Sequence, residues 1–278
     1  MIPASTQNMQ TSARPFDFEC YGVHIRIEGN DQAIVDEAER ITRKALLNDL
    51  RLITSEDLDT VFTFTVDPKG MIFLAHDGET IEWGDVPEYF FNHFNSLIRV
   101  AVAERAADRL FIHAGAVGWK GKAIILPGTS FAGKTTLVAE LVRNGATYYS
   151  DDYAIFDSSG LLHPFPRTLS MRADDEKHTR FDLTPTELGG VIGTEPLSVG
   201  TILLTEYKPD AQWDPQILSK GKGVLEMMPF TFSFVNRPDF SLGILNNIAS
   251  RAILVSSLRG SADNFAKTLL DFVDKNVN

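Results

Sequence analysis

The sequence predicts an α/β protein in which a small N-terminal α+β domain precedes a larger domain of alternating strands and helices. In residues 16–86, segments that alternate between apolar and polar side chains accompany one helical segment. From residue 111 onward, short apolar strands are followed by amphipathic helices, as in α/β domains. A glycine-rich loop at 128–135 lies between one such strand and a helix. A long helix over 87–110 is expected to connect the two domains.

The first domain is predicted from one helix and four strands. The segment 31–47 carries apolar residues at helical spacing. The segment VFTFTV alternates strictly, as a half-buried strand does. Turn residues at 67–70 and 76–78 separate the strands that follow. The expected strands are 16–27, 61–66, 71–75 and 79–83.

The second domain is predicted to begin with a hairpin, because two apolar strands flank the turn at Gly118–Gly121. The helix after the glycine-rich loop is expected to end at Asn144-Gly145. Residues 174–198 and 208–223 lack a clear period and are interpreted as loops or short helices. The expected strands are 111–117, 123–126, 147–149, 153–156, 199–207 and 252–255, and the expected helices are 134–143, 241–251 and 262–273.

The composition is that of an ordinary globular chain. Its 278 residues, 44% hydrophobic and 23% charged, allow one large domain or two modest ones. Cys20 is the single cysteine, so no disulfide can form within the chain, which fits a reducing compartment. A net charge of −11 disfavours general nucleic-acid binding, because an acidic chain repels a polyphosphate backbone. A nucleotide site needs only a local positive patch and stays possible.

The N-terminal segment and the hydropathy pattern favour a cytoplasmic protein. Residues 1–15 are rich in Ser, Thr, Gln and Pro and lack the apolar core of a signal peptide, so we expect a disordered lead-in. No apolar run reaches the ~20 residues that a membrane helix needs. We therefore expect no membrane partner.

One segment matches the phosphate-binding pattern G-x-x-x-x-G-K-[ST]. It comprises Gly128, Thr129, Ser130, Phe131, Ala132, Gly133, Lys134 and Thr135, with Thr136 next to it. The glycines allow successive backbone N–H groups to point inward, and the following helix adds its N-terminus, so together they bind an anion. Lys134 is expected to reach the β- and γ-phosphates of ATP, and the Thr135 hydroxyl to bind Mg²⁺. The alternative is a glycine-rich turn with a solvent-exposed lysine.

Asp151 and Asp152 follow the first strand after this helix. A right-handed crossover puts that strand in the same sheet, so its carboxyl end opens on the side of the glycine-rich loop. A carboxylate there can hold Mg²⁺ or accept a proton from an attacking hydroxyl. The alternative is a solvated turn or a capping pair.

Histidine and arginine side chains complete the candidate site. His113 lies in the strand expected to pair with the strand before the loop, where it either tunes the carboxylates or serves as a hydrogen-bonded core residue. Arg167 and Arg172 could stabilise charge on the γ-phosphate, or form surface salt bridges. The same alternatives hold, with less support, for Arg237, Arg251 and Arg259. No Cys/His cluster has zinc spacing, and no Gly-x-Ser-x-Gly elbow occurs.

The segment from His113 to Arg172 resembles the catalytic domain of HPr kinase/phosphorylase. The similar features are HAGAV, AIILPGTSFAGKTTLVAEL and YSDDYAIFD, in this order. The segment is more similar still to HPr-kinase-like proteins of bacterial gene clusters, including lasso-peptide kinases. Those share the pattern seen here at His163, Pro164, Pro166, Arg167, Leu169 and Ser170.

The resemblance implies an ATP-dependent kinase of serine hydroxyls with a PEP-carboxykinase-like core. It implies that Asp151 is the proton acceptor, Asp152 a Mg²⁺-linked acid, and His113 the histidine beside the catalytic Asp. HPr kinases carry a metal-binding Glu in a Glu-Ile-Arg-Gly segment, where this chain has Leu169-Ser170-Met171-Arg172. They also form hexamers, so a homo-oligomer is expected by analogy.

The sequence is compatible with three functions. The first is a kinase using Mg-ATP on a hydroxyl of a peptide, protein or small molecule. The second is an ATP-binding regulatory module without phosphotransfer, which the missing Glu favours. The third is a P-loop NTPase that hydrolyses ATP to drive conformational work. The sequence names neither the phosphate acceptor nor the donor among ATP, GTP and pyrophosphate.

Overall fold

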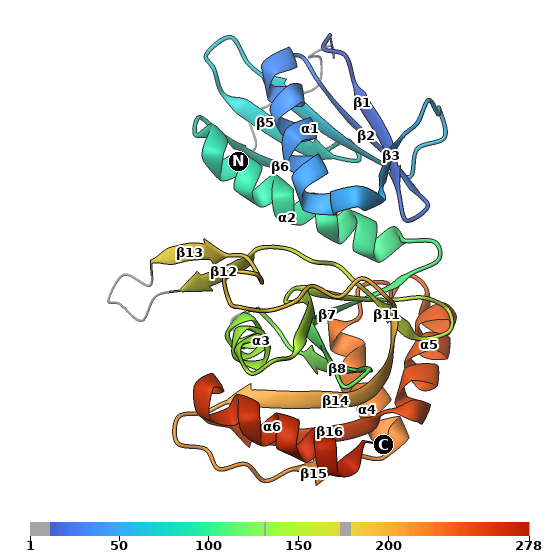
Figure 1. The fold of residues 1–278 in the computed structure, drawn as a ribbon. Coiled ribbons are helices and arrows are strands. Elements are labelled where there is room, and N and C mark those ends of the chain that lie inside the picture. The colour runs from blue at the N-terminus through green and yellow to red at the C-terminus, as the bar shows by residue number, and fades with distance from the viewer. Residues whose placement is uncertain (1–11, 131, 173–178, 278) are drawn as a thin grey trace. The chain divides into compact units, whose positions relative to one another are not determined.

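A computed structural model describes residues 12–130, 132–172 and 179–277. The chain divides into two compact units, Met1–Asp108 and Arg109–Asn278. Each is a mixed arrangement of helices and sheet (Figure 1). Within the described ranges, no helix combines the length and hydrophobicity of a transmembrane span.

The first unit is built on a six-stranded sheet with strand order β3-β1-β2-β4-β5-β6. Only β2 and β4 run parallel, because helix α1 lies between them in the chain. The other neighbouring strands are antiparallel. The strands are β1 (Phe16–Cys20), β2 (Val23–Gly29), β3 (Leu50–Leu52), β4 (Thr60–Val66), β5 (Ile72–His76) and β6 (Glu79–Gly84).

Helices α1 (Gln32–Leu46) and α2 (Pro87–Arg105) close the core of this unit, and the 3-10 turn η2 (Leu47–Asp49) follows α1. Asp31 caps α1 by accepting hydrogen bonds from the backbone N–H groups of Ala33 and Ile34. The ring of Phe94 on α2 meets Phe62 and Phe64 of β4 edge-on. The predicted connecting helix therefore packs within the first unit.

One expectation about the first unit needs correction. The segment 16–27 forms a hairpin rather than one strand, because Tyr21 and Gly22 adopt positive φ angles and turn the chain. The expected lead-in 1–15 lies outside the described residues except for 12–15. There the N–H groups of Ser12 and Ala13 donate to the carbonyl of Gly29.

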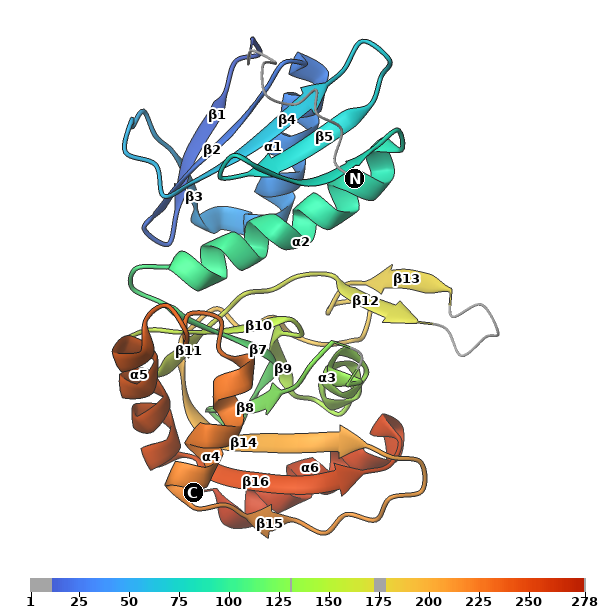
Figure 2. The same ribbon diagram turned by 180° about the vertical axis from the view of Figure 1, so that it is seen from behind.

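The second unit contains a larger mixed sheet with strand order β11-β10-β7-β8-β14-β16-β15, and β9 pairs with β7 (Figure 2). Strands β8, β14 and β16 run parallel to one another. A separate ribbon is formed by β12 and β13. The strands are β7 (Leu110–Trp119), β8 (Lys122–Pro127), β9 (Thr147–Ser150), β10 (Tyr153–Phe156), β11 (Leu161–His163), β12 (Leu169–Arg172), β13 (Arg180–Leu183), β14 (Leu197–Tyr207), β15 (Gln216–Ile217) and β16 (Ile253–Arg259).

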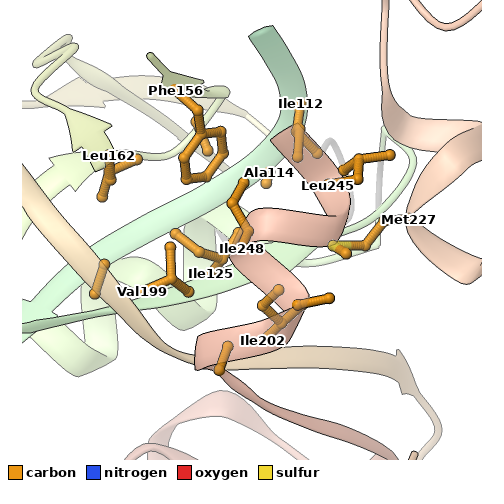
Figure 3. Packing of buried hydrophobic residues seen from close by; sticks show 14 of the residues in the cluster. Ile112, Ala114, Ile125, Phe156, Leu162, Val199, Ile202, Met227, Leu245 and Ile248 are labelled. Carbon is orange, nitrogen blue, oxygen red and sulfur yellow. The ribbon is translucent and has the colours of Figure 1, made fainter. Parts of the chain in front are cut away.

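Helices cover both faces of this sheet, so its central strands are apolar on both sides. Along β8, Ile125 packs in the cluster shared with α4 and α5, and its neighbours Ile124 and Leu126 pack in the cluster shared with α3 and α6. Figure 3 shows the first cluster, where Phe156 and Ile248 lie. The helices are α3 (Lys134–Arg143), α4 (Lys220–Met227), α5 (Pro238–Arg251) and α6 (Ala262–Asn276), with the 3-10 turn η3 (Met228–Phe230).

The predicted hairpin, the helix after the glycine-rich loop and the strands before and after Asp151-Asp152 are confirmed within one or two residues. The later elements are confirmed with shifted ends, since α5 begins at Pro238 and β16 extends to Arg259. Interpreting 208–223 as loop or short helix is right for the start of α4 but misses β15. The segment 174–198 includes β13 and the first residues of β14, which the sequence pattern did not indicate.

Candidate functional site

The register of three strands brings the candidate residues to one place on the sheet. Strand β7 pairs with β8 along one edge, and with β9 and then β10 along its other edge. Ala114 of β7 lies opposite Pro127, the last residue of β8, and its N–H donates to the carbonyl of Asp152 at 3.1 Å. The start of the glycine-rich loop and the carboxylate pair therefore flank the same position of β7.

A local break between β9 and β10 gives the two acids different surroundings. The buried Ser150 hydroxyl accepts hydrogen bonds from the N–H groups of Asp152 and Tyr153, so the chain turns within two residues and then resumes pairing with β7. Tyr153 then lies opposite His113. The turn directs Asp151 into the interior, where it is 8% exposed, and leaves Asp152 half-buried.

The loop after β8 leads directly into α3 through Gly133. This residue has a φ of 76°, in the left-handed region that favours glycine, and no side chain caps the helix. The first N–H groups of a helix have no partner within it, so those of Lys134 and the residues after it are available to an anion. Phe131 of the loop lies outside the described residues.

Arg259, at the end of β16, holds this loop. Its guanidinium is almost fully buried and donates hydrogen bonds of 3.1 Å to the carbonyls of Ala132, Gly133 and Gly260. Burial lowers the pKa of Arg259 below its ordinary value. A cation fixed behind the loop adds positive potential where an anion would bind.

Gly133→Ala is expected to destabilise the protein more than Gly121→Ala, a matched glycine in the β7–β8 turn. Both have positive φ, which costs either variant about 1–2 kcal/mol. A Cβ on Gly133 would lie 2.5 Å from Arg259 Nη2, whereas one on Gly121 meets nothing within 4 Å. Because three carbonyls hold the guanidinium, we expect a further loss of about 1–3 kcal/mol in the free energy of unfolding, measured with urea. Equal losses in the two variants would contradict this role of Arg259.

Lys134 lies folded over the loop. Its Nζ donates to the carbonyls of Gly128 and Thr129 at 2.9 and 2.8 Å and lies 3.2 Å from Nε2 of His113. Burial lowers the pKa of Lys134, and the charges of Asp152 and Asp151 act in the opposite direction. The predicted lysine, histidine and acid pair are therefore electrostatically coupled.

Asp151 is held by two hydroxyl groups. Tyr148 Oη donates to Asp151 Oδ1 at 2.9 Å and lies 3.1 Å from the carbonyl of Arg167, and the Thr135 hydroxyl also hydrogen-bonds Asp151. Burial raises the pKa of the Asp151 carboxyl, the two hydroxyls act to lower it, and the charge of Asp152 raises it. A cation bound beside this carboxylate would offset the cost of its burial.

Asp152 faces a histidine and an arginine instead. Its Oδ1 lies 3.8 Å from Nε2 of His113, and its Oδ2 lies 3.5 Å from Nη1 of Arg167. His113 also packs against the rings of Tyr153 and Phe232, so it is both a packed residue and a neighbour of the acids. The structure thus brings Arg167 and His113 to the same carboxylate.

Arg237, Arg251 and His163 have contacts outside the acid pair, and the side chain of Arg172 lies outside the described residues. Arg237 stacks on Phe240, and Arg251 donates to the carbonyl of Ser159. His163, which precedes a proline and was expected to be a turn residue, instead lies in β11, and its ring pairs with Asp157 of the turn after β10. Although burial acts to raise it, hydrogen bonds from His163 and Ser159 lower the pKa of Asp157 to about 2.

The donors near the loop fit a Mg²⁺ ion. Within residues 12–130, 132–172 and 179–277, no three or more His, Cys, Asp or Glu side chains gather into a metal-binding group. A Mg²⁺ ion bound together with phosphates usually takes only one or two carboxylates and keeps several waters. The Thr135 hydroxyl beside the Asp151 carboxylate offers oxygen donors of that kind.

Two residues of this site were not assigned to it from the sequence. Tyr148 was not predicted to be a site residue. Its position in a buried strand, three residues before Asp151, could have indicated that its hydroxyl reaches that carboxylate. For Arg259 the sequence provided only weak support for a role at the phosphates, as for Arg237 and Arg251. Its position at the carboxyl end of a strand parallel to β14 could have indicated it, because such ends meet near ligand sites.

No protein-family model and no curated protein matches this chain. The similarity to HPr kinases rests on the motifs between His113 and Arg172.

Proposed function

We propose that this chain is an ATP-dependent kinase that transfers the γ-phosphate to a serine-type hydroxyl. The observation that supports this best is the convergence on β7 of the loop that matches the phosphate-binding pattern and of the Asp151-Asp152 pair. In this proposal the second unit is a P-loop core of the PEP-carboxykinase type. The acceptor is a peptide, protein or small molecule, and the use of ATP implies the cytoplasm.

The loop and its lysine would bind the phosphates. The N–H groups of the loop and of the first turn of α3 surround the anion, and Lys134 leaves the carbonyls of Gly128 and Thr129 to reach the β- and γ-phosphates. Arg259 keeps the loop in shape from behind. The exposed Thr136 follows on the same helical turn.

We assign the two carboxylates by their contacts. Thr135 and Asp151, joined by a hydrogen bond, would hold Mg²⁺, which neutralises phosphate charge when bound. Asp152 is more accessible and would accept the proton of the acceptor hydroxyl. That oxygen bonds to the γ-phosphorus while the bond to the β–γ bridging oxygen breaks, and ADP leaves. This assignment exchanges the roles that the resemblance to HPr kinases implies for Asp151 and Asp152.

His113 and Arg167 would act around Asp152. Arg167, close to Oδ2, is positioned to stabilise charge on the transferred phosphoryl group. His113 lies between Asp152 and Lys134, so it orients both groups.

Lys134→Ala is expected to weaken Mg-ATP binding at least about tenfold, or about 1.4 kcal/mol, since it removes the cation that meets the phosphates. Calorimetric titration of the full chain measures this. Lys122→Ala is the matched control, because Lys122 lies at the opposite end of β8 and contacts Ser198. Mg-ATP binding that is absent in folded wild type, or unchanged in Lys134→Ala, would overturn the proposal.

A further inference from the structure

Strand β6 forms one edge of the sheet in the first unit. The strand order ends at β6, which pairs with β5 and with no other described strand. Backbone groups along such an edge can pair with a further strand, so edge strands are commonly protected by lysine, by proline or by a covering segment. The sequence of β6 is ETIEWG and contains neither lysine nor proline. The kinase mechanism proposed above does not use this edge.

Large apolar side chains are exposed along and directly after β6. Ile81 and Trp83 of the strand are 39% and 41% exposed, and Val86 and Tyr89, which follow it, are 56% and 65% exposed. Exposed apolar side chains that are grouped in one place mark an interaction site more often than scattered ones do. A strand added to this edge would remove part of that apolar surface from water.

Trp83 lies on the face of the sheet that points away from α2. The preceding residue, Glu82, contacts His93 of α2, and successive residues of a strand point to opposite faces. Across the strands, Trp83 pairs with the buried Phe73 of β5. The next position of this row lies beyond the edge, where an apolar side chain of an added strand would contact Trp83.

The charge around this edge is negative. Residues 77–92 contain five acids and no Lys or Arg. Asp77 and Glu82 form ion pairs, whereas Glu79, Asp85 and Glu88 are exposed and form none with the described part of the chain. An added strand is therefore attracted if it is basic and repelled if it is acidic.

This charge favours a basic peptide over a second copy of the chain. A symmetric dimer that pairs two β6 edges would bring the same five acids together from both copies. The net charge of −11 on each chain adds to that repulsion. A peptide with Lys or Arg meets no such cost.

We propose that the β6 edge binds an extended basic peptide segment by strand addition, with apolar side chains at alternate positions of the segment. Backbone hydrogen bonds to β6 hold the segment in place. Its apolar side chains contact Ile81 and Trp83, and its basic side chains meet Glu79 and Asp85. The binding does not depend on the proposed kinase function, because all of these residues lie in the first unit.

The probe is a capped eight-residue peptide in which valine alternates with lysine, and its control has glutamate in place of lysine. Calorimetry with the full chain should show that the lysine peptide binds at least about tenfold more tightly than the glutamate peptide. Amide hydrogen exchange in residues 79–84, followed by mass spectrometry, should slow when the lysine peptide binds, because new backbone hydrogen bonds protect β6. A lysine peptide that does not bind, or that leaves this exchange unchanged, contradicts the proposal.

Two variants place the peptide on β6. Trp83→Lys and Ile81→Lys should each weaken binding of the lysine peptide at least about tenfold, since each replaces apolar surface with a like charge. Ile81→Lys keeps the test valid if the loss of Trp83 beside the buried Phe73 disturbs folding. Leu52→Lys is the matched control, because Leu52 is 64% exposed on β3, at the other edge of the same sheet. Equal affinity in the three variants would show that the peptide binds elsewhere.

Light scattering tests the second copy as the alternative occupant. A wild-type dimer that both Trp83→Lys and Ile81→Lys convert to a monomer would show that a second copy covers β6, and the proposal would be wrong. None of these experiments measures phosphoryl transfer. A chain that binds the lysine peptide at β6 but does not bind Mg-ATP therefore loses the proposed function and keeps this inference.

Discussion

Asp152→Asn is expected to slow phosphoryl transfer by about 10²–10⁴-fold without weakening Mg-ATP binding, because the amide keeps the shape of the side chain but cannot accept a proton. Asp152 is half-buried and lies beside His113 and Arg167, where a hydroxyl could reach it. Single-turnover kinetics with the identified acceptor, together with calorimetry of Mg-ATP, separate the chemical step from binding.

Two further Asp→Asn variants show whether the loss of phosphoryl transfer is specific to Asp152. Asp157→Asn is the control, because Asp157 follows β10 but pairs with His163 of β11. Asp151→Asn should raise the Mg²⁺ concentration needed for activity, since Asp151 contacts Thr135. If Asp151→Asn removes the chemical step and Asp152→Asn does not, the roles implied by the resemblance to HPr kinases are correct and ours are exchanged.

The same variants distinguish a kinase from the two other functions with which the sequence is compatible. A regulatory module would keep its ATP-dependent partner binding in both Asp→Asn variants. An NTPase would hydrolyse ATP in wild type at a rate that no acceptor changes. A kinase loses transfer to the acceptor in Asp152→Asn, and this loss is the result that we expect.

The sequence predicts the long periodic elements well, because the same face of each helix or strand packs against the core along its whole length and leaves a regular pattern of apolar residues. In helix α1 the buried residues recur every three to four positions, and in β4 buried and less buried residues alternate from Thr60 to Phe64, so each pattern indicates one type of element. The hairpin at Tyr21-Gly22 was missed because a non-glycine residue at positive φ gives no turn signal. The β12–β13 ribbon was missed because short strands carry little periodicity.

For the candidate site, the sequence indicates which residues gather but not which of them touch. The glycine-rich loop and the Asp pair are local motifs, and their joint position follows from a general rule of strand crossover. The pairing of Thr135 with Asp151 depends on which way each side chain turns at the β9–β10 break. The contact of Arg259 with the loop joins residues more than 120 positions apart, which no local pattern encodes.

Phe156→Ala is expected to lower the free energy of unfolding of the second unit by about 3–5 kcal/mol. Phe156 is fully buried on β10 and packs in the cluster that contains Leu162 and the α5 residue Ile248 (Figure 3). Removing the ring loses its burial and leaves a cavity between sheet and helix. Urea unfolding followed by the fluorescence of Trp119 and Trp213 measures the change.

Val235→Ala is the control and should change the free energy of unfolding by less than about 0.5 kcal/mol, because Val235 is 87% exposed. Phe156 lies four residues after Asp152 on the strand whose pairing with β7 aligns the acids with the loop. A loss of about 3–5 kcal/mol is a large fraction of the 5–15 kcal/mol typical of a domain. If the loss in Phe156→Ala were below about 1 kcal/mol, this core would not anchor β10, and the alignment of Asp152 with the loop would depend on the pairing of the strands alone.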